Sequence, residues 1–209
     1  MYLFSRNRTA HPDKILEATA YAIEITEKVN SISGLGLRVW SAVYGAPLGT
    51  IAWTATVASQ AEMGAASEKV LADSSYQDAL QGGQGLFDGP VEDQLVDMIA
   101  LAGDGGHGGD YASLVQAQTA SGRAADAMTF GVEILNHVSG LTGRDGVFGR
   151  SMYGPWGGIG WITMAASLDE VDAATSAIAA DPTYLAKVDA AGPLFIPGGS
   201  STRLTRRIA

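Results

Sequence analysis

Hydrophobic and polar positions divide the sequence into two kinds of segment. Residues 12–33 and 122–141 show the apolar spacing of long amphipathic helices, and shorter segments alternate in the manner of strands. We predict strands at 2–8, 36–44, 50–57, about 92–101, 111–118, 146–153, 159–166 and 202–208. This mixture of helices and strands predicts an α+β protein.

The two long helices carry signals at their ends. Pro12 lies near the first turn of the first helix and Gly34 follows its end. In the second helix Ser121 is a suitable N-cap, and Gly143 follows the end. A mostly apolar stripe of the first helix is expected to face the core, and it consists of Leu16, Ala20, Ile23 and Glu27.

The second half of the chain repeats the first. Identical residues recur 108 positions apart, and the pairs are Trp53/Trp161, Ser59/Ser167, Glu62/Glu170, Asp73/Asp181 and Tyr76/Tyr184. Upstream of a one-residue gap in a turn the offset is 109, with the pairs Lys14/Arg123, Tyr21/Phe130, Glu24/Glu133, Gly34/Gly143 and Tyr44/Tyr153. So many matches in order at one offset indicate an internal duplication.

Each copy is expected to have the order βαββαβ, which is the ferredoxin-like plait. The second helices begin with the capping boxes Ser59/Glu62 and Ser167/Glu170. A sheet with helices on one face leaves its other face bare, so two fused repeats are expected to pack sheet to sheet as an intramolecular α+β barrel. We predict repeat 1 at 1–101, a glycine-rich linker at 102–110 and repeat 2 at 111–209.

These features resemble a known group of proteins. The doubled βαββαβ order, the tryptophan on the third strand and the endings "ADSSY" (72–76) and "ADPTY" (180–184) are similar to the dimeric α+β barrel superfamily. That superfamily includes the antibiotic-biosynthesis monooxygenases and the NIPSNAP-like proteins. The resemblance implies a small-molecule barrel, and monooxygenase-like chemistry in which the substrate itself activates oxygen.

The segment "GDGGHGGDY" (103–111) matches the core of calcium-binding β-helix repeats. Such repeats bind calcium only when they are stacked, and a single copy offers too few oxygen ligands. A phosphate loop is also excluded, because no lysine followed by serine or threonine comes after the glycines. We therefore interpret the segment as a linker, with His107 as a solvated residue.

The net charge, the lengths of the apolar runs and the absence of cysteine exclude several classes of function. The net charge of −9 argues against nucleic acid as a partner, and no run of about 18 apolar residues predicts membrane insertion. The absence of cysteine excludes disulfides and thiolate metal sites, and it fits a cytoplasmic protein. A homo-oligomer is compatible with these data.

Candidate ligand-binding residues come from positions at which the two copies differ. Alternation in the strand 36–44 assigns Leu37, Val39, Ser41 and Val43 to the helix side, and Arg38, Trp40, Ala42 and Tyr44 to the other side. Arg6 and Arg8 of the first strand correspond to the uncharged Val115 and Ala117. We expect a pocket for a planar or carboxylate-bearing ligand in copy one, formed by Arg6, Arg8, Arg38, Trp40 and Tyr44. The alternative is that these arginines point outward or form salt bridges.

The three histidines do not have the spacing of a metal triad, and no metal or cofactor is expected. His11 is a further candidate ligand-binding residue, and a candidate general base at the mouth of the barrel, although spacing assigns it no acidic partner. His137 is expected to stabilise a helix C-terminus as a cation. A haem site with one histidine stays open, but nothing in the sequence favours it.

Several repeated or charged residues have structural interpretations. Trp53 and Trp161 are expected to pack in the core. In the closing strands Asp97 aligns with Arg206, and opposite charges there predict an ion pair across the duplication, with solvated charges as the alternative.

Two functions remain. The first is a barrel that binds or transforms a small apolar or aromatic molecule, without a metal or tightly bound cofactor. The second is a non-catalytic barrel, filled by side chains, that serves in a protein assembly.

Overall fold

The computed structural model describes residues 1–103 and 109–209, so the glycine-rich core of the predicted linker and His107 lie outside the described residues. The elements are β1 (Tyr2–Ala10), α1 (Ile15–Ser33), β2 (Arg38–Tyr44), β3 (Thr50–Val57), α2 (Gln60–Ala72), α3 (Ser74–Gln81), β4 (Phe87–Ala102), β5 (Tyr111–Gln118), α4 (Ala124–Thr142), β6 (Gly146–Tyr153), β7 (Gly158–Ala165), α5 (Leu168–Ala180), α6 (Pro182–Ala191), the 3₁₀ turn η1 (Gly192–Leu194) and β8 (Ser201–Arg207).

The strands are hydrogen-bonded in the order β1-β3-β2-β8-β5-β7-β6-β4, which is the order of a closed barrel. This order confirms the predicted fold class, an α+β barrel built from a doubled βαββαβ pattern. Contacts divide the chain into two compact units. Unit 1 is Met1–Val96 with Arg206–Ala209, and unit 2 is Asp97–Thr205. The linker and the limits expected for the repeats remain predictions.

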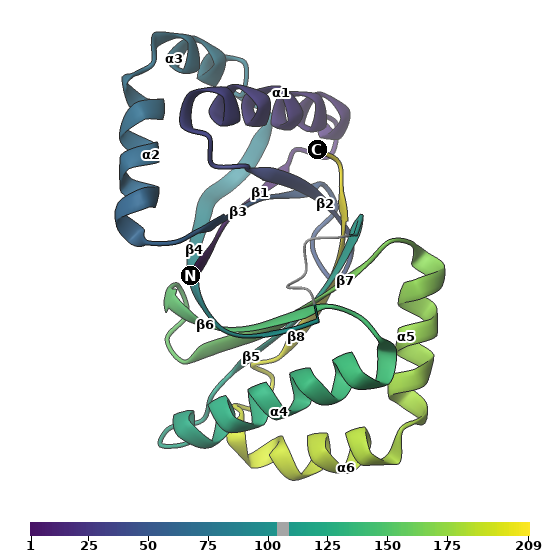
Figure 1. Cartoon of the computed structure of the whole chain (residues 1–209). Helices are drawn as coiled ribbons and strands as arrows, with labels where there is room; N and C mark the ends of the chain where they lie inside the picture. The colour runs from purple at the N-terminus through teal and green to yellow at the C-terminus, as the bar shows by residue number, and fades with distance from the viewer. Residues whose placement is uncertain (104–108) are drawn as a thin grey trace. The chain divides into compact units, whose positions relative to one another are not determined.

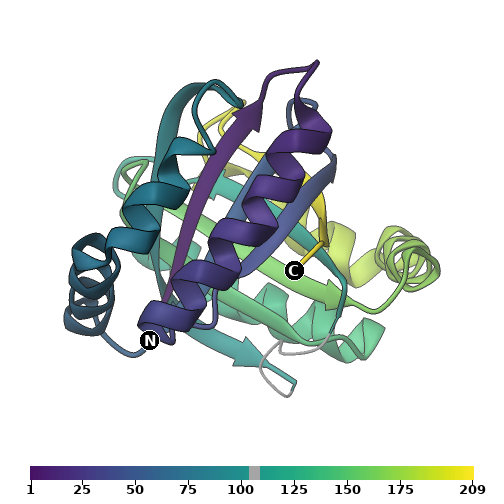
Figure 2. The ribbon, with the colours of Figure 1, turned by 90° about the horizontal axis from the view of Figure 1, so that it is seen from above.

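In unit 1, β3 lies between β1 and β2, and both pairs are antiparallel. Arg6 and Arg8 of β1 lie opposite Trp53 and Ile51 of β3. Directly opposed residues of an antiparallel pair share one face of the sheet. Helices α1, α2 and α3 lie along one face of this sheet (Figure 1), and α1 lies over the strands of its own unit and runs alongside β1 (Figure 2).

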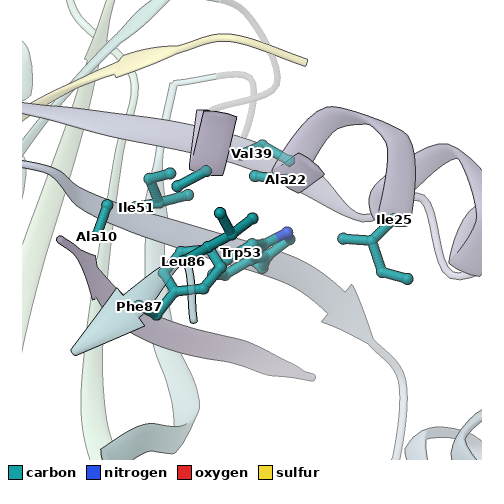
Figure 3. Packing of buried hydrophobic residues seen from close by; sticks show 9 residues of the cluster. Ala10, Ala22, Ile25, Val39, Ile51, Trp53, Leu86 and Phe87 are labelled. Atoms are coloured by element: carbon teal, nitrogen blue, oxygen red, sulfur yellow. The ribbon is translucent and has the colours of Figure 1, made fainter. Parts of the chain in front are cut away.

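The core of unit 1 lies between α1 and that face (Figure 3). The expected apolar stripe of α1 is wrong, because the side chain of Leu16 is 86% exposed. Small residues face the sheet in its place, and Ala18 and Ala22 are fully buried. Large rings such as that of Trp53 fill the space under α1, so the helix approaches the sheet through alanines.

Unit 2 repeats this arrangement, with β7 between β5 and β6 and with α4, α5 and α6 on one face of its sheet (Figure 1). Phe148 is fully buried, and its ring stacks on Trp161 with centroids 5.2 Å apart. Trp53 is buried in the core of unit 1, and Trp161 is partly buried and packs against the core of unit 2, as the sequence predicts.

The N-caps predicted for α2 and α5 form in both units, but each glutamate accepts from the residue before the N-cap and not from the N-cap itself. The N–H of Glu62 donates to Ser59 Oγ at 3.1 Å, and Glu62 Oε2 accepts from the N–H of Ala58 at 2.6 Å. Glu170 makes the same two hydrogen bonds with Ser167 and Ala166.

The single second helix expected in each copy is two helices in the structure. Asp73 ends α2, and its carboxylate accepts from the backbone N–H groups of Ser75 and Tyr76, which starts α3. Asp181 does the same between α5 and α6. Asp181 Oδ2 also lies 3.2 Å from His137 Nε2, so this histidine pairs with a carboxylate as well as lying near a helix end.

The predicted ion pair between Asp97 and Arg206 is also wrong. Asp97 Oδ2 accepts hydrogen bonds from Arg150, at 3.1 Å from its Nη2. The strand order gives the reason, because β4 is next to β6, which carries Arg150, whereas β8 lies between β2 and β5. In the described part of the chain, no helix is both long and apolar enough to cross a membrane.

Candidate functional site

The register of unit 1 separates the predicted ligand-binding residues into two groups. Arg38 and Trp40 lie opposite Thr54 and Ala52, on the face turned away from the helices. Tyr44 shares that side by alternation, and it is 70% exposed. Arg6 and Arg8 lie on the other face, toward the helices.

In the first group, the side chain of Trp40 is fixed by burial and by a hydrogen bond. Its side chain is 6% exposed, and its indole Nε1–H donates to Thr54 Oγ1 at 2.8 Å. The ring is therefore fixed and its donor is satisfied.

His11 has the acidic partner that spacing could not assign. Its Nδ1 lies 2.8 Å from Asp88 Oδ1, at the start of β4, and both side chains are partly exposed. The N–H of His11 donates to the carbonyl of Leu86, which fixes the backbone beside this pair. A carboxylate that orients an imidazole is the arrangement that general-base catalysis uses.

The helix-facing group belongs to a set of side chains that we call the aromatic–arginine cluster: Arg8, Tyr21, Trp53 and Phe87. The guanidinium carbon of Arg8 lies 4.4 Å from the centroid of the Phe87 ring, a cation–π distance. The rings of Tyr21 and Trp53 each lie 6.1 Å from the same ring. Figure 3 shows Trp53 beside Phe87 and Leu86.

Two donors of the cluster are buried without a hydrogen-bond partner among the described residues. They are Nε of Arg8 and Nε1 of Trp53. A buried donor that loses its water and gains no partner costs about 1–3 kcal/mol. Each of these N–H groups is therefore free to donate to an acceptor atom of a bound molecule.

The electrostatics of the cluster follow from burial. Desolvation lowers the pKa of the Arg8 guanidinium, against an opposing effect of Tyr21. Desolvation also raises the pKa of Tyr21, so its hydroxyl stays protonated well into the alkaline range. The cluster thus presents neutral and cationic donors.

Arg6 forms an ion pair, whereas Arg8 lies against an aromatic ring. Its Nε and Nη2 donate to the two carboxylate oxygens of Asp93, at 2.8 and 2.7 Å. Hydrogen bonding to Asp93, with a further contribution from Tyr76, raises the pKa of Arg6. Arg6 is therefore largely neutralised, whereas no ion pair of Arg8 is found in the described part of the chain.

Gly83 permits the position of Tyr21. A Cβ at this glycine would lie 2.5 Å from Tyr21 Cζ and 2.7 Å from its hydroxyl oxygen. The segment between α3 and β4 therefore packs directly on the phenol, and a larger residue would displace it.

The equivalent positions of unit 2 form a closed apolar core. Ala117, Phe130, Trp161 and Phe195 stand where unit 1 has the cluster. Trp161 Nε1–H donates to the carbonyl of Gly131 at 2.9 Å, so its donor is satisfied. Only unit 1 combines the three rings with a guanidinium and a phenolic hydroxyl.

Sequence reasoning pointed to Arg8 but did not assign Tyr21, Trp53 or Phe87 to the site. A signal was present in the repeat, because Tyr21 and Arg8 replace apolar residues of the other copy. Phe87 gave no such signal, since it lies before the predicted start of its strand. In the described residues no cluster of three His, Asp or Glu side chains has the proximity of a metal site.

Comparisons of structures identify the fold. The chain aligns over its full length with 92% of a candidate monooxygenase from Fusobacterium nucleatum, at 8% identity and a TM-score of 0.74. An anthrone oxidase-like protein aligns with 100% of this chain and 92% of its own, at 11% identity and a TM-score of 0.65. The chain shares the fold of these two proteins.

A third structure with this fold is LmHde, a heme-degrading enzyme from Listeria monocytogenes. It covers 99% of each chain, at 7% identity and a TM-score of 0.55. No protein-family model matches the sequence, and comparison with curated proteins also gives no match.

Proposed function

We propose that the protein binds a planar aromatic compound at the aromatic–arginine cluster of unit 1 and oxygenates it without a metal or tightly bound cofactor. The observation that carries this proposal is the pair of buried, unpartnered donors, Arg8 Nε and Trp53 Nε1. The shared fold with monooxygenase-like proteins supports the reaction class.

The residues have separate roles in this proposal. The rings of Tyr21 and Phe87 offer apolar surfaces to a planar substrate. Arg8 Nε and Trp53 Nε1 each offer a hydrogen-bond donor to the substrate, and a donor at its oxygen atom stabilises the charge that develops when a phenol or enol loses its proton. The resulting carbanion-like substrate is the species that reduces O₂.

In this proposal a ligand reaches the buried donors after the chain beside Tyr21 moves away. Gly82 and Gly83 pack on Tyr21 at the start of the segment that leads to β4. Displacement of this segment would expose the phenol and the donors behind it.

Oxygen uptake with anthrone as substrate tests the proposal. Oxidation of anthrone to anthraquinone consumes one O₂ and releases one water, so electrode and absorbance readings must agree. Arg8→Ala places the residue of unit 2 in unit 1, and we expect kcat/KM to fall about 10²-fold. Trp161→Phe, which removes the satisfied donor of unit 2, is the matched control and should leave kcat/KM unchanged.

The first group of candidate residues, Arg38, Trp40 and Tyr44, provides a competing location. Arg38→Ala removes a cation from the face that turns away from the helices. If this change lowers kcat/KM while Arg8→Ala does not, the ligand lies with Arg38, Trp40, Tyr44 and His11, and the cluster is not the site.

The filling of the equivalent unit 2 core favours one alternative, a non-catalytic barrel that serves in an assembly. In that case native mass spectrometry of the purified protein shows no co-purified ligand. Anthrone then gives neither binding nor oxygen uptake above the rate in buffer.

A further inference from the structure

A groove of about 310 Å³ lies at the hairpin between β6 and β7 in unit 2. Its size is at the lower end of the range for small-molecule sites. The lining consists of Arg150, Ser151, Met152, Gly154, Pro155 and Trp156. None of these residues belongs to the aromatic–arginine cluster.

The indole of Trp156 is the most unusual part of this lining. It is 94% exposed, whereas Trp40 and Trp53 are each 6% exposed. Its backbone is nevertheless fixed, because the carbonyl of Trp156 accepts from Gln118 Nε2 at 3.0 Å and the carbonyl of Gly157 accepts from the N–H of Thr119 at 3.0 Å. The hairpin thus holds a large aromatic surface in solvent on a rigid support.

Ser151 supplies a polar group in the same lining. Its Oγ is buried and has no hydrogen-bond partner among the residues that the structure describes. A serine hydroxyl both donates and accepts, and rotation about χ1 moves it between staggered positions. A ligand atom in the groove would satisfy it.

The charges at the groove do not favour a strongly anionic ligand. The guanidinium of Arg150 donates through Nε and Nη2 to Asp97 Oδ2, at 3.3 and 3.1 Å. This cation is therefore already neutralised, and its planar group and stem remain as groove surface. Met152 adds an adaptable apolar contact and is 40% exposed.

The equivalent hairpin of unit 1 lacks these features. Ser41, Ala42 and Leu48 stand at the positions of Arg150, Ser151 and Trp156. The hydroxyl and the indole are therefore additions of the second copy to a shared hairpin, and no packing role within the unit explains an indole in solvent.

We propose that this groove binds a small, uncharged, planar aromatic compound that lies on the indole of Trp156 and hydrogen-bonds Ser151 Oγ. The proposal does not depend on the function assigned to unit 1.

The test uses the full chain labelled with ¹⁵N and follows the indole N–H signals of its tryptophans by NMR. The probe is 2-naphthol, with decahydro-2-naphthol as the non-planar control and 2-naphthoate as the charged control. We expect 2-naphthol to shift the Trp156 signal in a saturable manner, and to bind at least tenfold more tightly than either control. The Trp53 signal reports separately on the cluster of unit 1.

Variants sharpen the result. Trp156→Leu and Ser151→Ala introduce the residues of unit 1, and we expect them to weaken 2-naphthol binding in the groove about tenfold and about fivefold. Leu48→Ala in the other hairpin should leave this affinity unchanged. The proposal is overturned if the Trp156 signal does not move, if Ser151→Ala binds with the affinity of the wild type, or if the non-planar control binds equally well.

Discussion

Each unit contains a group of three aromatic rings beneath its first helix, and the residues that surround these rings differ between the two units. In unit 1 the centroids of Tyr21 and Trp53 lie 6.1 Å from that of Phe87, and in unit 2 those of Phe130 and Trp161 lie 5.8 and 6.4 Å from that of Phe195. The ring arrangement is thus retained while its surroundings change.

Unit 2 completes its rings with a fourth one. Phe148 stacks on Trp161, and it fits because Gly131 of α4 has no side chain at the contact. Unit 1 has Val39 and Ala22 at these two positions, and it places the guanidinium of Arg8 over Phe87. One copy is therefore a finished apolar core, and the other retains unpaired donors at the cost of stability.

The largest expected effect comes from converting the packing of unit 2 to that of unit 1. A Cβ at Gly131 would overlap the buried Phe148 ring, so Gly131→Ala should cost about 1–3 kcal/mol in the free energy of unfolding. Phe148→Val leaves a cavity and should cost about 2–3 kcal/mol. The double variant should cost clearly less than the sum, because alanine and valine coexist in unit 1.

Urea unfolding of the wild type, the two single variants and the double variant measures this coupling. Ala22→Gly in unit 1 is the control, because unit 1 has Val39 at the position of Phe148 and therefore no ring that could fill the space. If the losses in the free energy of unfolding of the two single variants add exactly in the double variant, then positions 131 and 148 are not coupled, and this pair does not explain the difference between the units.

A smaller effect isolates the two indole donors. Trp161→Phe loses the hydrogen bond to the Gly131 carbonyl, whereas Trp53→Phe removes a donor that has no described partner. Both changes remove the same atoms, from a buried ring at Trp53 and from a partly buried ring at Trp161. We therefore expect Trp161→Phe to be more destabilising by about 1 kcal/mol. Equal losses in urea unfolding would mean that Trp53 is satisfied in solution.

Repetition made much of this fold predictable. Capping residues act on their nearest neighbours in the chain, so Ser59 and Glu62 could be assigned from spacing alone. Alternation in β2 placed Val39 and Trp40 on opposite faces, because the side-chain period of a strand is two.

The remaining features depend on contacts distant in sequence. The face of α1 that packs on the core consists of Ala18, Ala22 and Ile25. Leu16 lies outside this face and is exposed, although hydrophobicity alone ranks leucine above alanine. The face of Arg8 depends on its pairing with Ile51, and the partner of Asp97 depends on the strand order. The spacing of residues along the chain predicts neither the face of Arg8 nor the partner of Asp97. The lack of a hydrogen-bond partner at Arg8 Nε and Trp53 Nε1 also depends on three-dimensional contacts, and spacing along the chain does not predict it.

A further prediction compares the two repeated aspartates at acid pH. Hydrogen bonds from Ser75 and the Tyr76 N–H lower the pKa of Asp73, and those from the N–H groups of Tyr184 and Thr183, with His137, lower the pKa of Asp181. A depressed pKa in the folded state contributes stability above the ordinary value near about 4, and this contribution is lost as the pH falls through the folded value.

Asp73→Ala and Asp181→Ala should therefore each reduce the thermal stability near neutral pH and flatten its decline below about pH 4. Thermal midpoints measured from neutral to acid pH test this. Asp78→Ala, within α3, is the control. A decline as steep in both variants as in the wild type would contradict the assignment.

The smallest expected effect concerns the hydroxyl that distinguishes Tyr21 from Phe130. Burial raises the pKa of Tyr21, so the folded protein keeps this proton at a pH at which the unfolded chain releases it. Stability that is present below about pH 10 is consequently lost as the pH rises through the folded value, and Tyr21→Phe should lose less on passing from pH 8 to about pH 11. Urea midpoints at the two pH values measure the difference. Tyr44→Phe removes a hydroxyl on a ring that is 70% exposed, and it should leave the alkaline decline unchanged. An equal decline in the wild type and Tyr21→Phe would show that the phenol of unit 1 is as accessible to water as an ordinary surface tyrosine.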